Sequence, residues 1–203
     1  MGMIINPYLV QPSIPPFTGL LDTYSGAAVA YSAARRLSSS YTGALIRVRR
    51  SSDNTEQDIG YNGSNVLDES ALTTFVGAND GFVVKWYDQS GNGNNASQAT
   101  AANQPKIVSS GTVIKQAGLG ASQPALSFDG VNDFLDLTSL VTTANYTSFI
   151  AQRRLNISLS SQWLTQKPSG GGTRPYAAIL YGGTGTIFMS TYNSTTQILS
   201  SNN

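Results

Sequence analysis

A strand that runs directly into a loop of glycine, asparagine and serine constrains this chain more than any other feature. The run VKWYDQSGNGNNA covers residues 84–96. Further along, ALSFDGVNDFLDL at residues 125–137 has the pattern of strand, Asp-Gly turn and strand. Asp-Gly between two apolar runs is a strong short-range signal for a hairpin. Both features predict a β-sandwich whose short strands are joined by polar loops.

The rest of the chain also predicts mainly strands. Residues 43–49 alternate between apolar and polar side chains, as a half-buried strand does. Other strands are expected at 82–87, 105–108, 125–128, 134–137, 147–152, 162–166, 176–181, 186–192 and 197–200. Two short helices are expected in the first third. One spans 25–38, with Ser25 as N-cap and alanines at helical spacing, and the other spans 68–75, with Asp68 as N-cap.

Composition excludes several classes of function. Charged residues make up 11% of the 203 residues, the formal net charge is +1, and no nucleic-acid partner is therefore expected. The chain has no cysteine and no histidine, which excludes disulfides, Cys/His zinc sites and Ser-His-Asp triads. The N-terminus has no basic region and is interrupted by prolines, so we expect neither a signal peptide nor insertion into a membrane.

Several segments together resemble known domains. The runs AVAYSAARRL at 28–37, LIRVRRSSD at 45–53 and WYDQSGNGN at 86–94 are similar to the start of the catalytic domain of the fungal α-L-arabinofuranosidase B family. FDGVND at 128–133 resembles the laminin-G or concanavalin A-like domains of phage and bacterial surface proteins. The resemblance extends to about residue 140 and implies a concanavalin A-like jelly roll. The chain stops before all strands of that fold are present, so we expect it to be truncated or completed by another subunit.

The resemblance to phage proteins implies a function. The arabinofuranosidase family takes its catalytic acids from positions beyond the resemblance, and the chain has no acidic residue after Asp136. We therefore expect a non-enzymatic phage virion structural protein, a fibre or decoration on the head or tail surface that is assembled in the host cytoplasm. The alternative is a carbohydrate-binding or adhesion module that recognises host glycans, and a glycosidase fragment is a third reading.

Residues 1–21 are expected to form an anchoring arm in front of a sandwich at 22–203. Prolines favour an extended chain there. Its apolar side chains are too many for a solvated linker. We expect the arm to dock on other virion proteins or on a second copy in a homo-oligomer, through Ile4, Ile5, Pro7, Tyr8, Leu9 and Phe17.

Two further sites are open on the sequence alone. Oxygen atoms of Asp88, Asn92 and Asn94 are candidate Ca²⁺ ligands, whereas the alternative is a glycine turn in which these side chains bond nearby backbone N–H groups. No other cofactor is expected. Aromatic rings suited to stacking on a sugar are Trp163, Tyr176 and Tyr181, and Trp86 is assigned to the core because it lies within a strand.

Overall fold

The computed structural model describes residues 15–116, 122–137, 151, 161–162, 177–181, 187–191 and 197–201. Within these ranges the secondary structure is mainly antiparallel β-strand, accompanied by two short α-helices and one 3-10 helix, η2 (Ala101–Asn103). The prediction of a mostly β protein with two short helices is confirmed at this level. No helix in the described ranges is long and apolar enough to cross a lipid bilayer.

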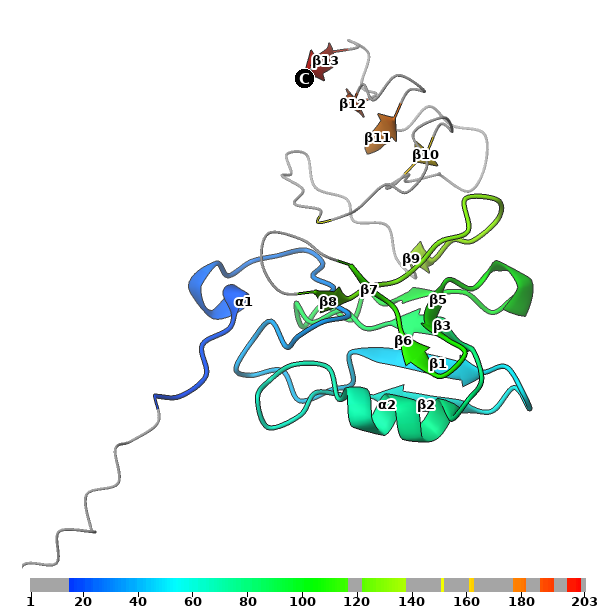
Figure 1. The fold of residues 1–203 in the computed structure, drawn as a ribbon. Coiled ribbons are helices and arrows are strands. Elements are labelled where there is room, and N and C mark those ends of the chain that lie inside the picture. Colours follow the sequence, from blue (N-terminus) through cyan, green and yellow to red (C-terminus); the bar gives the residue numbers. More distant parts are fainter. Residues whose placement is uncertain are drawn as a thin grey trace, which may run out of the picture.

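The largest sheet is built from the first two thirds of the chain (Figure 1). Its strand order is β2-β1-β3-β4-β9, and β5 extends it by pairing with both β3 and β6. The bounds are β1 Ile46–Arg50, β2 Glu56–Ile59, β3 Gly81–Trp86, β4 Ala96–Ser97, β5 Lys106–Ser109, β6 Thr112–Val113 and β9 Asp136–Leu137. All of these pairings are antiparallel.

Two smaller sheets complete the described strands. One pairs β7 (Lys115–Gln116) with β8 (Gln123–Pro124). The other has the order β10-β11-β12-β13, with bounds Ser161–Gln162, Ala177–Tyr181, Ile187–Thr191 and Gln197–Ser201. The strands predicted near 162, 176, 186 and 197 correspond to these four. The strand predicted at 147–152 lies almost wholly outside the described residues.

One face of the large sheet packs against helix α2 (Glu69–Val76). Ile46 and Val48 alternate with arginines along β1 and are fully buried, as the sequence predicts. Helix and sheet approach closely at Gly81, because an added Cβ would lie 3.1 Å from the Val76 side chain. The helix begins where predicted, since the Asp68 carboxylate accepts the N–H of Ala71 at 2.9 Å.

The prediction of a helix at 25–38 is wrong. This segment crosses the molecule as an irregular chain, and its backbone bonds go to distant residues instead of to its own next turn. The N–H of Ala30 donates to Asp88, its carbonyl accepts from Gln89, and the carbonyl of Ala34 accepts from Leu67. Alanine spacing gave a helical pattern, but long-range partners satisfy the backbone groups that a helix would have paired locally.

The end of the predicted arm contacts the domain. Helix α1 (Leu20–Thr23), which the sequence did not predict, follows Gly19, and the Phe17 ring lies 5.3 Å from the Arg36 guanidinium carbon. Gly19 approaches the main chain of the 37–40 turn so closely that an added Cβ would lie 2.2 Å from the Leu37 carbonyl oxygen. The other arm residues, Ile4, Ile5, Pro7, Tyr8 and Leu9, lie outside the described residues.

Candidate functional site

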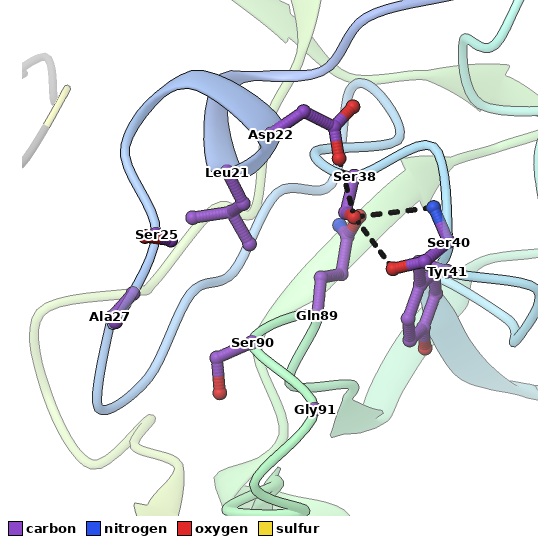
Figure 2. Close-up of a pocket in the computed structure, with 11 residues that line it drawn as sticks. Leu21, Asp22, Ser25, Ala27, Ser38, Ser40, Tyr41, Gln89, Ser90 and Gly91 are labelled. Carbon is purple, nitrogen blue, oxygen red and sulfur yellow. Dashed lines mark hydrogen bonds between the residues drawn. The ribbon is translucent and has the colours of Figure 1, made fainter.

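A cavity of about 290 Å³ lies where three loops meet (Figure 2). The first loop follows α1, the second is the turn at 38–41, and the third begins at the end of β3. In Figure 2, Leu21 projects from α1 toward Gln89 and Ser90, while Ser25 and Ala27 lie on the chain that follows the helix. The lining residues are Leu21, Asp22, Ser25, Gly26, Ala27, Ser38, Ser40, Tyr41, Gln89, Ser90 and Gly91.

Asp22 holds the helix side of the cavity in place. Its carboxylate accepts hydrogen bonds from the N–H of Gly19 at 2.6 Å, the hydroxyl of Ser38 at 2.9 Å and the N–H of Ser39 at 2.9 Å. These backbone and hydroxyl donors lower the pKa of Asp22 to about 2. The group is therefore an ionised carboxylate at neutral pH, and it joins α1 to the 38–41 turn.

Asp88 fixes the side of the cavity that is formed by the loop after β3. Its side chain is buried, and both oxygens accept two hydrogen bonds each. One oxygen accepts the N–H of Ala30 and of Ser90, both at 2.9 Å. The other accepts the Ser90 hydroxyl at 2.8 Å and the N–H of Asn94 at 3.0 Å. The cluster formed by Asp88 and these four donors, which we call the Asp88 cluster, connects the end of β3 to its own loop and to the chain at residue 30.

The amides of Asn92 and Asn94 complete this connection. The side-chain N–H₂ of Asn92 donates to the carbonyls of Ala27 and Ala28, and that of Asn94 donates to Ala28. In these positions the oxygens of Asp88 face N–H and O–H donors, as in the turn alternative. No group of three acidic side chains that could hold a metal occurs in the described ranges. Ca²⁺ binding by these residues stays a prediction that chelation can test.

Gln89 is a structural residue of the site that sequence reasoning missed. It is 2% exposed, its side-chain oxygen accepts the N–H of Leu37 at 2.7 Å, and its N–H₂ donates to the carbonyl of Arg35 at 3.2 Å. Because a glutamine amide both donates and accepts, it can pair with two points of an irregular backbone. Asp22 was also missed, although an acid three residues after Gly19 is a signal for a helix start.

Trp86 is half-buried, so its predicted core position is correct only in part. It packs on the core cluster, and its ring centroid lies 5.3 Å from that of Tyr31. Its indole N–H is buried and has no hydrogen-bond partner among the described residues. The hydroxyl of Tyr31 donates to the Asn94 carbonyl, and desolvation raises the pKa of Tyr31.

The described residues do not show the three predicted sugar-stacking rings together at one site. Trp163 and Tyr176 lie outside the described residues, and Tyr181 is the last residue of β11 with its side chain outside the description. Tyr41 is the aromatic residue that lines the cavity, and its hydroxyl donates to the Ala44 carbonyl at 2.6 Å. Desolvation raises the pKa of Tyr41 to about 12.

All eleven acidic residues of the chain precede residue 137, and most have structural partners. Arg47 pairs with Asp58, Arg50 with Asp53, Lys106 with Asp80 and Lys115 with Glu69, each at 2.7 Å or less.

The acids of the 129–133 turn differ in their titration. Desolvation raises the pKa of Asp133, whereas backbone N–H bonds lower that of Asp129. One oxygen of Asp129 accepts the N–H of Val131, Asn132 and Asp133, so this carboxylate fixes the turn that precedes β9. The predicted hairpin is wrong, because residues 125–128 form only an isolated bridge between Ser127 and Lys106, and β9 pairs with β4. The Asp-Gly turn is therefore stabilised by hydrogen bonds from backbone N–H groups to the Asp129 side chain.

Comparison with known proteins identifies similar sequences and folds. The sequence model of the family described as "Alpha-L-arabinofuranosidase B, catalytic" matches residues 22–127. The α-L-arabinofuranosidase B of Aspergillus niger is 42% identical over 71 residues, which are 34% of this chain and 14% of that protein. A probable α-L-arabinofuranosidase B of Aspergillus flavus is 37% identical over 104 residues, 49% of this chain and 19% of that protein. The matched segments thus cover less than a fifth of the length of these relatives.

Solved structures share the fold at low sequence identity. An arabinofuranosidase complexed with arabinofuranosyl-α-1,2-xylobiose is similar with a TM-score of 0.57 and 18% identity, over 89% of this chain and 43% of that one. A GH54 α-L-arabinofuranosidase soaked with a cyclic sulfate inhibitor gives 0.55 and 17%, with the same coverage.

These comparisons correct the expected function. The matched family and relatives are named as arabinofuranosidases, which are enzymes, and this contradicts both a non-enzymatic phage virion protein and a non-enzymatic adhesion module. The named relatives come from Aspergillus fungi, which contradicts a place on the virion surface. The error came from FDGVND at 128–133, since Asp-Gly recurs wherever two strands need this turn.

Proposed function

Because this chain belongs to the α-L-arabinofuranosidase B catalytic family, we propose that it takes part in the hydrolysis of α-L-arabinofuranosidic linkages. The observation that carries the proposal is the family match over residues 22–127. This stretch contains the buried core, helix α2 and the three loops that meet at the cavity. The similarity to two solved arabinofuranosidases supports the same fold over most of the chain.

The described residues contribute a rigid frame to this function. The Asp88 cluster ties the loop after β3 to residue 30, and Gln89 ties the same loop to residue 37. Loops that carry binding groups work best when buried hydrogen bonds fix them on a sheet. We infer that the motif WYDQSGNGN, which lies within the matched residues 22–127, serves to fix this loop on the sheet.

The acids of the 129–133 turn do not have the arrangement that proton transfer in glycoside hydrolysis requires. Glycoside hydrolysis uses two carboxyl groups on opposite sides of the scissile bond, one of them protonated. Asp133 and Asp129 differ in pKa in the required sense, but backbone donors of one turn hold the Asp129 carboxylate. We therefore assign Asp129 to turn formation and not to acid–base chemistry. Asp133→Asn should leave arabinofuranosidase turnover within about twofold, because this variant keeps an acceptor for the Asp129 N–H.

The finer architecture is also a proposal. The antiparallel sheets and the sandwich-type similarity support a concanavalin A-like jelly roll, in which the sheet β2-β1-β3-β4-β9 forms one layer. The core face of β1 and β3 is covered by α2, which fits a sheet packed on one side.

The test is turnover of an aryl α-L-arabinofuranoside by the intact protein. We expect release of the aryl alcohol, with an aryl β-D-xylopyranoside as the control substrate that is not cleaved at a comparable rate. Asp88→Ala should reduce turnover because it frees the loop, and Glu56→Ala, on an exposed edge strand, should not. A folded intact protein that releases nothing from the arabinofuranoside would refute the proposal.

A further inference from the structure

Two Asn-Gly pairs occur in the chain, Asn62-Gly63 and Asn92-Gly93. In such a pair the backbone nitrogen of the glycine can attack the side-chain amide carbon of the asparagine, because glycine has no side chain that obstructs the approach. Both asparagines are exposed, and an added Cβ at either glycine would have nothing within 4 Å. Neither glycine N–H donates a hydrogen bond to a described residue. The two pairs are thus matched in exposure and nucleophile, and the hydrogen bonds of the asparagine side chains decide which pair reacts.

The side-chain amide of Asn92 is held by its nitrogen. Its N–H₂ donates to the carbonyls of Ala27 at 2.9 Å and Ala28 at 3.1 Å and to the Ser90 hydroxyl at 3.1 Å. Deamidation removes this nitrogen as ammonia, so the reaction must break these bonds. An aspartate in the same place has no donor and directs negative charge at two carbonyl oxygens. Both the reaction and its product are therefore disfavoured at Asn92.

The side-chain amide of Asn62 is held by its oxygen instead. This oxygen accepts the N–H of Ser64 at 2.9 Å and of Val66 at 3.4 Å, and no residue in the described ranges accepts from the N–H₂. N–H donors stabilise the negative charge that develops on the amide oxygen during attack, as an oxyanion hole does. The leaving nitrogen breaks no hydrogen bond to a described residue. An aspartate keeps both donors, and its charge strengthens their bonds.

We propose that Asn62 is a site of spontaneous deamidation in the folded protein and that the structure protects Asn92. The Gly63 nitrogen loses its proton to hydroxide and forms a bond to the Asn62 amide carbon. The bond from that carbon to the N–H₂ nitrogen breaks, and the nitrogen takes a proton from water and leaves as ammonia. The cyclic imide that results takes up one water molecule and opens at either carbonyl, which gives aspartate or isoaspartate.

The two products differ in their effect on the 62–66 turn. Aspartate leaves the main chain unchanged, whereas isoaspartate extends it by a methylene group between residues 62 and 63. The same turn contains Asn65, whose carbonyl accepts the N–H of Arg36 at 2.9 Å and whose side-chain oxygen accepts the Arg36 guanidinium at 3.2 Å. Isoaspartate therefore disturbs the contact between this turn and the chain at residue 36.

The experiment is incubation of the folded protein at mildly alkaline pH, followed by digestion with trypsin and mass spectrometry. Cleavage after lysine and arginine places the two pairs on separate peptides, 51–85 and 86–106. We expect aspartate and isoaspartate to accumulate at Asn62 at least about tenfold faster than at Asn92, because each net hydrogen bond of the leaving group slows its departure about threefold to tenfold. Equal rates, or a faster reaction at Asn92, would overturn the inference.

Unfolding separates the effect of structure from that of local sequence. In concentrated guanidinium chloride both amides lose their partners, so the two rates should agree within about twofold. A preference for Asn62 of the same size in the unfolded chain would refute the structural explanation.

Gly63→Ala tests the nucleophile, because the added Cβ has open space and obstructs only the attacking nitrogen. It should slow the reaction at Asn62 and leave the rate at Asn92 unchanged, which also shows that the variant is folded. An unchanged rate at Asn62 in this folded variant would exclude attack by the residue 63 nitrogen.

Discussion

Replacing Asp88 with alanine tests whether one buried carboxylate organises the loops around the cavity. Asp88 is 5% exposed, and its four hydrogen bonds come from three backbone N–H groups and one hydroxyl. The alanine variant leaves all four donors without an acceptor. A buried donor left unsatisfied costs about 1–3 kcal/mol, and the half-buried setting of Ala30, Ser90 and Asn94 lets water replace part of the loss.

The expected loss for Asp88→Ala is about 3–4 kcal/mol, a large share of the ~5–15 kcal/mol that stabilises a typical domain. Asp88→Asn should lose less, about 1–2 kcal/mol, because its remaining oxygen keeps one pair of donors. Urea unfolding monitored by far-UV circular dichroism measures both losses as shifts of the midpoint at constant slope.

Glu56→Ala is the matched control. Glu56 is an exposed acid in edge strand β2 with no hydrogen bond to a described side chain, and its removal should change stability by no more than about 0.5 kcal/mol. If Asp88→Ala unfolds at the same urea concentration as Glu56→Ala, the four bonds contribute no net stability and the reasoning fails.

Three further predictions follow from the same geometry. Trp86→Ala should lower the free energy of unfolding by about 2–3 kcal/mol in urea, which is less than the ~3–5 kcal/mol of a fully buried tryptophan. The loss is smaller because the ring is half-buried and its N–H has no partner among the described residues. A larger loss would show that the ring is fully packed. The pKa of Asp22 is lowered from 3.8 to about 2 in the folded protein, so its contribution to stability is present above pH 4 and is lost as the pH falls toward 2. Melting temperatures of the native protein and Asp22→Asn should therefore converge over that range, and parallel curves would contradict this. Excess EDTA should leave the melting temperature unchanged, because donors occupy the Asp88 oxygens; a rise on adding Ca²⁺ would instead support the metal alternative.

Elements with a local signal were predictable from the sequence. β1 follows from alternation of buried and arginine positions, and α2 follows from Asp68 as its N-cap. The turn at 129–133 follows from Asp-Gly. In each case the residues that decide the structure are within five positions of each other, and one window of sequence contains both partners.

The site was not predictable in this way. The bond between Ala30 and Asp88 joins residues 58 apart, and the bond between Leu37 and Gln89 joins residues 52 apart. Nothing near residue 30 indicates that its N–H will meet a carboxylate, so the alanine spacing at 25–38 was interpreted as a helix. Local propensity is a weak prior that such long-range partners override.

The polar loop after β3 shows what decides between two interpretations of one motif. Asp88, Asn92 and Asn94 offer oxygen atoms at spacings that suit either a cation or a turn. The segment at 27–30 supplies the deciding groups, because its N–H and carbonyls match the acceptors of Asp88 and the donors of both asparagines. A cation would need those oxygens turned away from Ala30 and Ser90, which would break the link that closes one wall of the cavity. Metal binding and the observed contacts of the Asp88 cluster are therefore alternatives for this loop, and the chelator experiment distinguishes them.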